Sequence, residues 1–239
     1  MITEVSLDDS ENDCILKGRE LKAAVRSAGM RVAKQMTAVF GPNLLFLERA
    51  VGLLARTMFC KAGLRGVSSP EIGHKILLIA TYFQGCETTG RLIAEGQHAK
   101  AAAALKQDFE MLTRIGEIDA GTAKEGKTPH MRHAPNGSAR LYGDLNKVAH
   151  PSNESLLHRH LEQVVTDGMR GVSPIPTFRE DTALNEFKLH CWLCYSMCHA
   201  SVLVLLENYG EEDPYVEDCL NRFVHLQDSG LELGLLRRI

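Results

Sequence analysis

The feature that most constrains the fold is a long apolar segment near the C-terminus, residues 180–208. Its middle, which reads WLCYSMCHASVLVLL, is apolar nearly all round a helix of 3.6 residues per turn. A helix that is apolar on every side needs neighbours on every side, so we expect it at the centre of a helical domain. Ser196, His199 and Ser201 interrupt the run, which favours a buried helix over a membrane span.

The composition agrees with a helical fold. Aromatic residues make up only 6% of the 239 residues, and Ala, Leu and Val dominate the apolar fraction, which suits packed helices better than β-sandwiches. The length supports one core, and no strand–turn–strand pattern or internal repeat stands out. We therefore predict an all-α fold, an antiparallel bundle of about six to seven helices, in which a flexible segment 1–12 precedes a single domain 13–239.

Start and stop signals set the predicted helix boundaries. Gly41 and Pro42 end the first helix, Ser69 followed by Pro70 begins another, and Gly96 marks a tight turn. Residues 116–137 and 166–180 lack periodicity and are predicted to be long loops. Eight segments are predicted to be helical, of which about six to seven form the bundle: residues 14–40, 44–63, 69–95, 97–115, 138–150, 152–165, 180–208 and 213–227.

The charges are unevenly distributed although the formal net charge is only −3, which does not mark a general nucleic-acid binder. Residues 14–65 carry ten Lys and Arg against two acids, whereas residues 179–239 carry eleven acids against five bases. The basic segment could meet a phosphate backbone or an acidic partner. It could equally meet the acidic segment of the same chain or of a second copy, and we expect a homo-oligomer.

The N-terminus is acidic and lacks the apolar stretch of a signal peptide, and the seven cysteines are scattered. Both features predict a cytoplasmic protein with free thiols and no membrane association. Cys191, Cys194 and Cys198 resemble a metal site, but on a helix they fall within about 60° of one another in an apolar stripe. We interpret them as core residues, and we expect no metal and no cofactor.

Histidines are concentrated between residues 130 and 160. Such a density is typical of metal sites, phosphate contacts or proton transfer. His158 and His160 would point in different directions on a helix, so a metal centre is not favoured. The histidines of this region are His130, His133, His150, His158 and His160.

The predicted helix 138–150 places hydrogen-bonding side chains in a row. Tyr142, Asn146 and His150 are spaced i, i+4, i+8 beside an apolar face, whereas Arg140 lies on the solvent face. This row is either one wall of a polar pocket or a buried polar strip that fixes helix packing. The candidate binding residues are Tyr142, Asn146 and Arg140.

The helix before the first long loop supplies a pair of charges. Lys106 and Glu110 are four residues apart at the edge of an apolar stripe. On an exposed helix they would form an ordinary surface pair. At the edge of a core they could instead meet Tyr142 and His150.

Two segments resemble proteins of the HEPN superfamily, all-α domains of bacterial toxin–antitoxin, anti-phage and RNA-processing systems. The first is similar to the helical hairpin of these proteins, which has a Gly at its turn, small residues, and a basic residue four positions before a Glu. The second is similar to a later helix that carries a Tyr, a Leu followed by a small polar residue, and a His-Pro. The corresponding residues are Gly96, Ala99, Ala102, Lys106 and Glu110 in the first segment, and Tyr142, Leu145, Asn146, His150 and Pro151 in the second.

The chain departs from the ribonuclease members of that superfamily, which carry an Arg four to six residues before a His. His150 has no Arg at this spacing, and we treat the match between Arg91 and His98 as chance because they flank the turn at Gly96. Lys106 also stands where an Arg is more usual, and a Lys lacks the bidentate fork.

Three hypotheses follow. The resemblance implies a non-catalytic HEPN-like module that binds a protein, nucleotide or RNA partner in bacterial stress or defence. The second hypothesis is a metal-independent ribonuclease, in which His150 is the general acid or base and Lys106, beside Glu110, stabilises the phosphorane. The third is a structural protein that self-assembles through its charge asymmetry.

Overall fold

A computed structural model describes residues 9–67, 69–135, 138–149, 155, 161–166 and 169–236. The chain is all-α in class, as predicted: six long helices make up most of this part of the chain, together with a short 3-10 helix and one two-stranded hairpin. The elements are α1 (Asp9–Phe59), α2 (Pro70–Ala94), α3 (His98–Asp119), η1 (Met131–His133), α4 (Ala139–Ala149), β1 (Glu162–Thr166), β2 (Met169–Ser173), α6 (Glu180–Tyr209) and α7 (Pro214–Glu232).

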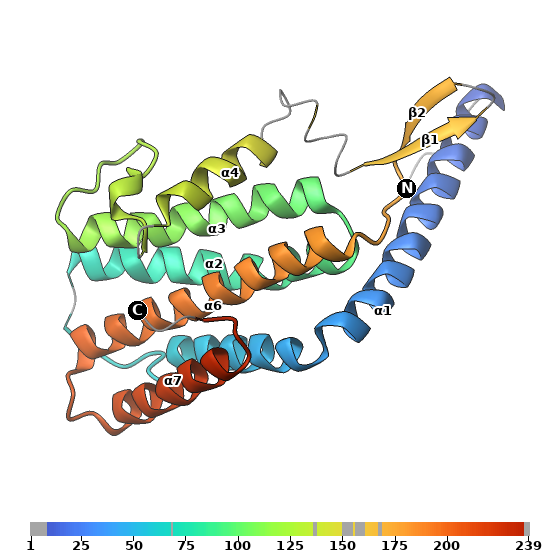
Figure 1. Cartoon of the computed structure of the whole chain (residues 1–239). Helices are drawn as coiled ribbons and strands as arrows, with labels where there is room; N and C mark the ends of the chain where they lie inside the picture. The colour runs from blue at the N-terminus through green and yellow to red at the C-terminus, as the bar shows by residue number, and fades with distance from the viewer. Residues whose placement is uncertain are drawn as a thin grey trace, which may run out of the picture.

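Helix α6 lies at the centre of the molecule, as its all-round apolar sequence predicts. It contacts α1, α2, α3 and α7, while α4 packs on the outer side of α3 (Figure 1). Cys191, Cys194 and Cys198 are fully buried among these contacts, which confirms their interpretation as core residues. Within the described residues, no three His, Cys, Asp or Glu side chains are grouped so as to hold a metal ion.

By length and composition, α1 and α6 each contain a stretch apolar enough to cross a membrane. Most of this stretch of α6 is buried against other helices of the same chain, as in the core helix of many folds. This burial explains its apolar sequence without a membrane, whereas the corresponding stretch of α1 is less buried.

Helix α1 runs unbroken through Gly41 and Pro42, so the predicted helix end at this point is wrong. Proline removes one helical N–H and usually bends a helix, and α1 changes direction midway along its length (Figure 1). Tertiary packing holds both sides of the bend: Phe40 stacks on Phe187 of α6 at 4.5 Å between ring centroids, and Phe46 is buried. The helix already begins at Asp9, within the segment predicted to be flexible.

The α2–α3 hairpin forms where the start and turn signals predict it. Ser69 caps α2 by accepting a hydrogen bond from Ile72 N at 3.2 Å, and Pro70 occupies the first helical position. Gly96 adopts φ +74° between the two helices, and a Cβ there would lie 2.8 Å from Thr177 O. The glycine is therefore required both by its backbone conformation and by the close approach of the segment that precedes α6.

The β-hairpin is not predicted by the sequence analysis, which assigned residues 152–165 to a helix and residues 166–180 to a loop. The strands β1 and β2 are antiparallel, with Val164 opposite Gly171. The β-branched run Val164, Val165 and Thr166 favours a strand over a helix. The two residues between the strands are Asp and Gly in the sequence, which is a strong hairpin signal that a search for helical periodicity overlooks.

The first long loop is shorter than predicted because α3 continues to Asp119. Side chains of α3 hold the loop: Arg114 donates to the carbonyl oxygens of Lys124, at 3.1 Å, and Lys127. Glu117 Oε1 accepts from His130 N at 2.7 Å. The loop is thus fixed to the last turns of α3.

Candidate functional site

The structure brings Lys106, Glu110 and Tyr142 together where α4 packs on α3. Tyr142 donates its hydroxyl hydrogen to Glu110 Oε1 at 2.7 Å. Lys106 Nζ lies 3.8 Å from the same Glu110 oxygen and 5.7 Å from the centroid of the Tyr142 ring. We call these three residues the edge cluster. Of the two alternatives for the Lys106–Glu110 pair, contact with Tyr142 is the one observed, whereas His150 lies outside the described residues.

Packing beneath the edge cluster fixes the position of Tyr142. Leu145, one turn further along α4, is buried in the core and anchors the helix. The ring of Tyr142 lies 6.0 Å from the ring of Phe109, a fully buried residue of α3. This apolar contact positions the ring so that its hydroxyl group reaches Glu110.

The environment of the edge cluster favours the protonated form of Tyr142. Partial burial, followed by the hydrogen bond to Glu110, raises the pKa of Tyr142 to about 12. A phenol with the ordinary pKa of about 10 is already a hydrogen-bond donor at neutral pH, and the raised pKa extends this state to more alkaline pH. Lys106 supplies a positive charge beside it, which attracts both the carboxylate of Glu110 and the face of the ring.

The charged members of the edge cluster remain accessible from solvent. The side chains of Lys106 and Glu110 are 25% and 27% exposed. An incoming anionic group can therefore reach Lys106 without unfolding of the helix pair, and it would compete with Glu110 for the ammonium group. The arrangement is suited to reversible binding of polar groups.

The other predicted site residues do not belong to the edge cluster. Asn146 is half-buried one turn after Tyr142, and Arg140 lies on the exposed face of α4, as the periodicity predicts. Three of the histidines, His150, His158 and His160, lie outside the described residues.

The two described histidines of the loop, His130 and His133, form hydrogen bonds within the loop. His130 Nδ1 accepts a hydrogen bond from Arg132 N at 3.2 Å. His133 Nε2 lies 2.7 Å from Arg132 Nε and 3.0 Å from Thr122 Oγ1. These contacts hold the segment around η1 together, so the described histidines of the His-rich region are separate from the edge cluster.

Two buried polar pairs on α3 were missed by the sequence analysis. Thr89 of α2 donates to Asp108 Oδ2 at 3.1 Å, and burial raises the pKa of Asp108 to about 7. His98 Nδ1 lies 2.7 Å from Glu186 Oε2 of α6, and burial raises the pKa of Glu186. The available signal is periodicity: both α3 residues occupy positions that continue the apolar stripe of that helix.

Comparison with known proteins adds no relative: no protein-family model, no curated protein and no solved structure matches the chain.

Proposed function

We propose that the chain is a HEPN-like module, an antiparallel helical bundle that binds RNA in bacterial stress or defence without cleaving it. The observation that carries the proposal is the edge cluster, in which Lys106 Nζ and the Tyr142 hydroxyl lie 3.8 Å and 2.7 Å from the same oxygen of Glu110, and the side chain of Lys106 is 25% exposed. An ammonium group and a neutral O–H donor together match the oxygen acceptors of a phosphodiester.

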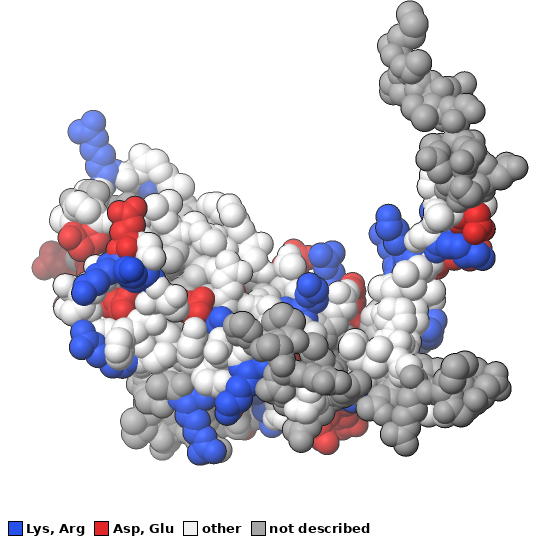
Figure 2. All heavy atoms as spheres, turned by 90° about the horizontal axis from the view of Figure 1, so that it is seen from above, with Lys and Arg blue, Asp and Glu red and all other residues white. Residues whose placement is uncertain are grey.

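The surroundings of the edge cluster support a polar ligand. Helix α4, which carries Tyr142, also presents Arg140 to solvent two residues before Tyr142. Figure 2 looks onto this side of the molecule and shows basic side chains interspersed with acidic ones. Mixed charge favours an RNA of defined shape over indiscriminate binding along any duplex, because acidic groups repel phosphates that are out of register.

The ribonuclease hypothesis would use Lys106 of the edge cluster together with His150. Helix α4 is described up to Ala149, and His150 follows it in the sequence, four positions after Asn146, outside the described residues. A general acid or base at position 150 would work together with Lys106 as the cation near the phosphate.

Binding of tRNA and of total bacterial RNA by the purified protein, measured by fluorescence anisotropy over a range of salt concentrations, tests the proposal. We expect Lys106→Met to weaken binding and to reduce the slope of log K against log salt by about 0.7 to 0.9, the value for one lost phosphate contact. The matched control is Lys147→Met, which removes the same charge from an exposed α4 residue paired with Asp144 at 3.3 Å.

Two outcomes contradict the proposal. Absence of RNA binding by the parent protein removes RNA as the partner and leaves a protein partner as the alternative. The second outcome is that the parent protein cleaves RNA, whereas His150→Ala binds RNA as tightly as the parent but does not cleave it. This result assigns the ribonuclease function instead.

A further inference from the structure

A hollow lined by basic and apolar residues lies between α1 and α7. These two helices lie on the opposite side of α6 from α4 (Figure 1). Three arginines and a histidine line the hollow: Arg49 and Arg56 from α1, and Arg222 and His225 from α7. We call this hollow the arginine groove. Its position separates it from the edge cluster, so any ligand it takes is independent of the proposed RNA surface.

Helical spacing builds the arginine groove. Arg49 and Arg56 of α1 lie two helical turns apart on the same face, and Gly52 and Leu53 lie between them, one turn from each. Leu53 and Leu226 are buried and form an apolar floor, and no other atom approaches within 4 Å of the position that a Cβ would take at Gly52. The groove therefore combines an open apolar base with cationic walls.

The positive charge of the arginine groove is only partly neutralised. Arg56 Nε and Arg222 Nε lie 2.6 Å and 2.9 Å from the same oxygen of Asp218, so two guanidinium groups share one carboxylate. Arg49 Nη1 contacts only the hydroxyl of Ser229, at 3.5 Å, among the residues that the structure describes. Three guanidinium charges thus face one carboxylate, and the hydrogen bonds to Asp218 use Nε rather than the terminal Nη groups.

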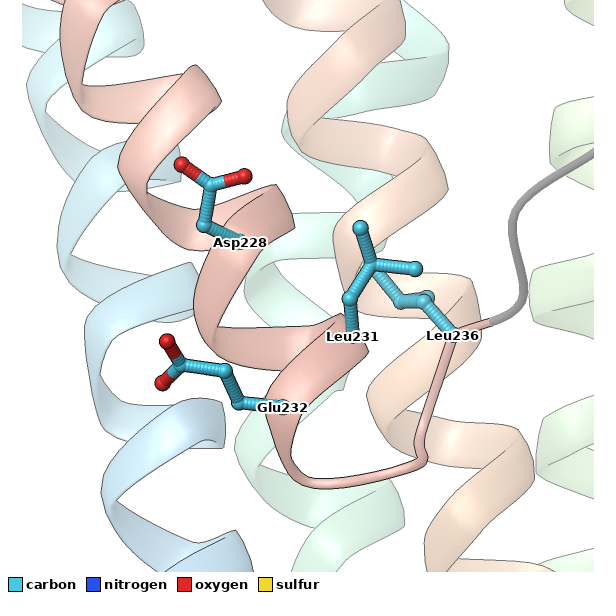
Figure 3. A pocket seen from close by; sticks show the side chains of 4 residues that line it. All are labelled: Asp228, Leu231, Glu232 and Leu236. Carbon is cyan, nitrogen blue, oxygen red and sulfur yellow. The ribbon is translucent and has the colours of Figure 1, made fainter.

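The size and the surroundings of the arginine groove favour a short ligand over a polymer. Its volume of about 550 Å³ lies in the range of small-molecule sites. Further along α7, Asp228 and Glu232 line a separate hollow with Leu231 and Leu236 (Figure 3). A phosphate backbone that continued along α7 would meet these carboxylates, whereas a ligand confined to the groove would not.

We propose that the arginine groove binds a nucleoside phosphate. Arg49, Arg222 and His225 hold the phosphate oxygens, because a guanidinium presents paired N–H groups that match two oxygens of one phosphate. The apolar floor of Leu53 and Leu226 receives the base. The inference goes beyond the proposed RNA binding, because neither Lys106 nor Tyr142 takes part.

Isothermal titration calorimetry of the full-length protein with ADP, pyrophosphate and adenosine tests the assignment. We expect ADP to bind most tightly, pyrophosphate more weakly, and adenosine least. Arg49→Gln should weaken ADP binding about tenfold or more, because it removes one charge-assisted contact to phosphate. Arg49 is chosen because it forms no ion pair with a described carboxylate, so that its loss leaves the Asp218 contacts intact.

The matched control is Arg31→Gln, which changes another exposed arginine of α1 whose Nη1 contacts a serine hydroxyl, Ser27 Oγ, at 2.9 Å. ADP affinity should be unchanged in this variant and in Lys106→Met. An affinity that falls in Lys106→Met but not in Arg49→Gln moves the nucleotide to the edge cluster and overturns the assignment.

Three other results also overturn it. The first is absence of ADP binding at millimolar concentration. The second is adenosine binding as tight as that of ADP, which would remove the role of the phosphates. The third is an Arg49-dependent affinity for tRNA or poly-glutamate without affinity for ADP, which would assign the groove to a polymer.

Discussion

The two faces of α3 carry similar polar groups in different surroundings. Toward α2 and α6, Asp108 and His98 are only 3% and 1% exposed and contact partners across helix interfaces. Toward α4, Lys106 and Glu110 form a contact that water can reach. The same helix thus has one face where polar groups influence stability strongly and one where they are available to a ligand.

The two faces of α3 are separated by packed side chains, and Phe109 is the main one. Phe109 is fully buried, with its ring 6.0 Å from Tyr142 of α4 and 6.2 Å from Trp192 of α6. Phe109→Ala should therefore lower the free energy of unfolding by about 3–5 kcal/mol, the effect of a large cavity in a core. Urea denaturation measures this effect.

Phe59→Ala is the control for this prediction, because Phe59 of α1 is 66% exposed and its truncation leaves no closed cavity. We expect a much smaller loss than for Phe109→Ala. Equal losses for the two variants would contradict the placement of Phe109 between α4 and α6.

The buried face makes stability depend on pH through Asp108. Its carboxyl has a pKa of about 7 in the folded protein and about 3.9 in an unfolded chain, so between these values the folded state binds more protons. The free energy of unfolding should then fall as pH rises from about 4 to about 7, by up to about 4 kcal/mol. Asp108→Asn, which cannot ionise, should lose the part of this decline that Asp108 causes, whereas the buried Glu186 still contributes its own part. The variant should be more stable than the parent protein at pH 8.

Thermal or urea unfolding of the parent and the variant at pH 5 and pH 8 checks the prediction. Asp144→Asn serves as the control, because Asp144 is exposed on α4 and should leave the pH profile of the parent unchanged. Parallel profiles for the parent and Asp108→Asn would show that Asp108 is solvated in the folded protein.

Local and periodic signals were sufficient for part of this architecture. The all-round apolar sequence predicted that α6 lies at the centre, and the Ser69–Pro70 pair predicted the start of α2. The i, i+4 spacing of Lys106 and Glu110 predicted that both lie at the edge of one apolar stripe, and contact with Tyr142 was one of two alternatives. Each of these features depends on residues of one continuous helical segment, where side-chain direction follows from helical geometry. The sequence also indicated Tyr142 as a candidate binding residue, because it lies beside the apolar face of its own helix.

Features that depend on tertiary contacts could not be predicted in this way. Pro42 is a helix breaker by local rules, but buried aromatic residues on both sides of it keep α1 continuous. The contact between His98 and Glu186 joins residues that are 88 positions apart. The arginine groove likewise depends on how α1 packs against α7, which no local pattern specifies.

The smallest expected effect lies on the exposed face, at Tyr142. Tyr142→Phe removes the hydrogen bond to Glu110 but keeps the ring on Phe109, so the free energy of unfolding should fall by no more than about 1 kcal/mol. Glu110 is accessible to water, which replaces the lost donor and limits the effect. Urea denaturation of Tyr142→Phe, Glu110→Gln and the double variant measures the coupling between the two residues.

Tyr215→Phe is the matched control, because Tyr215 is exposed on α7 and far from α3. A coupling well below 1 kcal/mol, together with weaker RNA binding in Tyr142→Phe, means that the hydroxyl serves the ligand more than the fold. A coupling of several kcal/mol would instead place Tyr142 and Glu110 with the buried pairs of α3. The two faces of the helix would then not differ in the way proposed, since both would act mainly on stability.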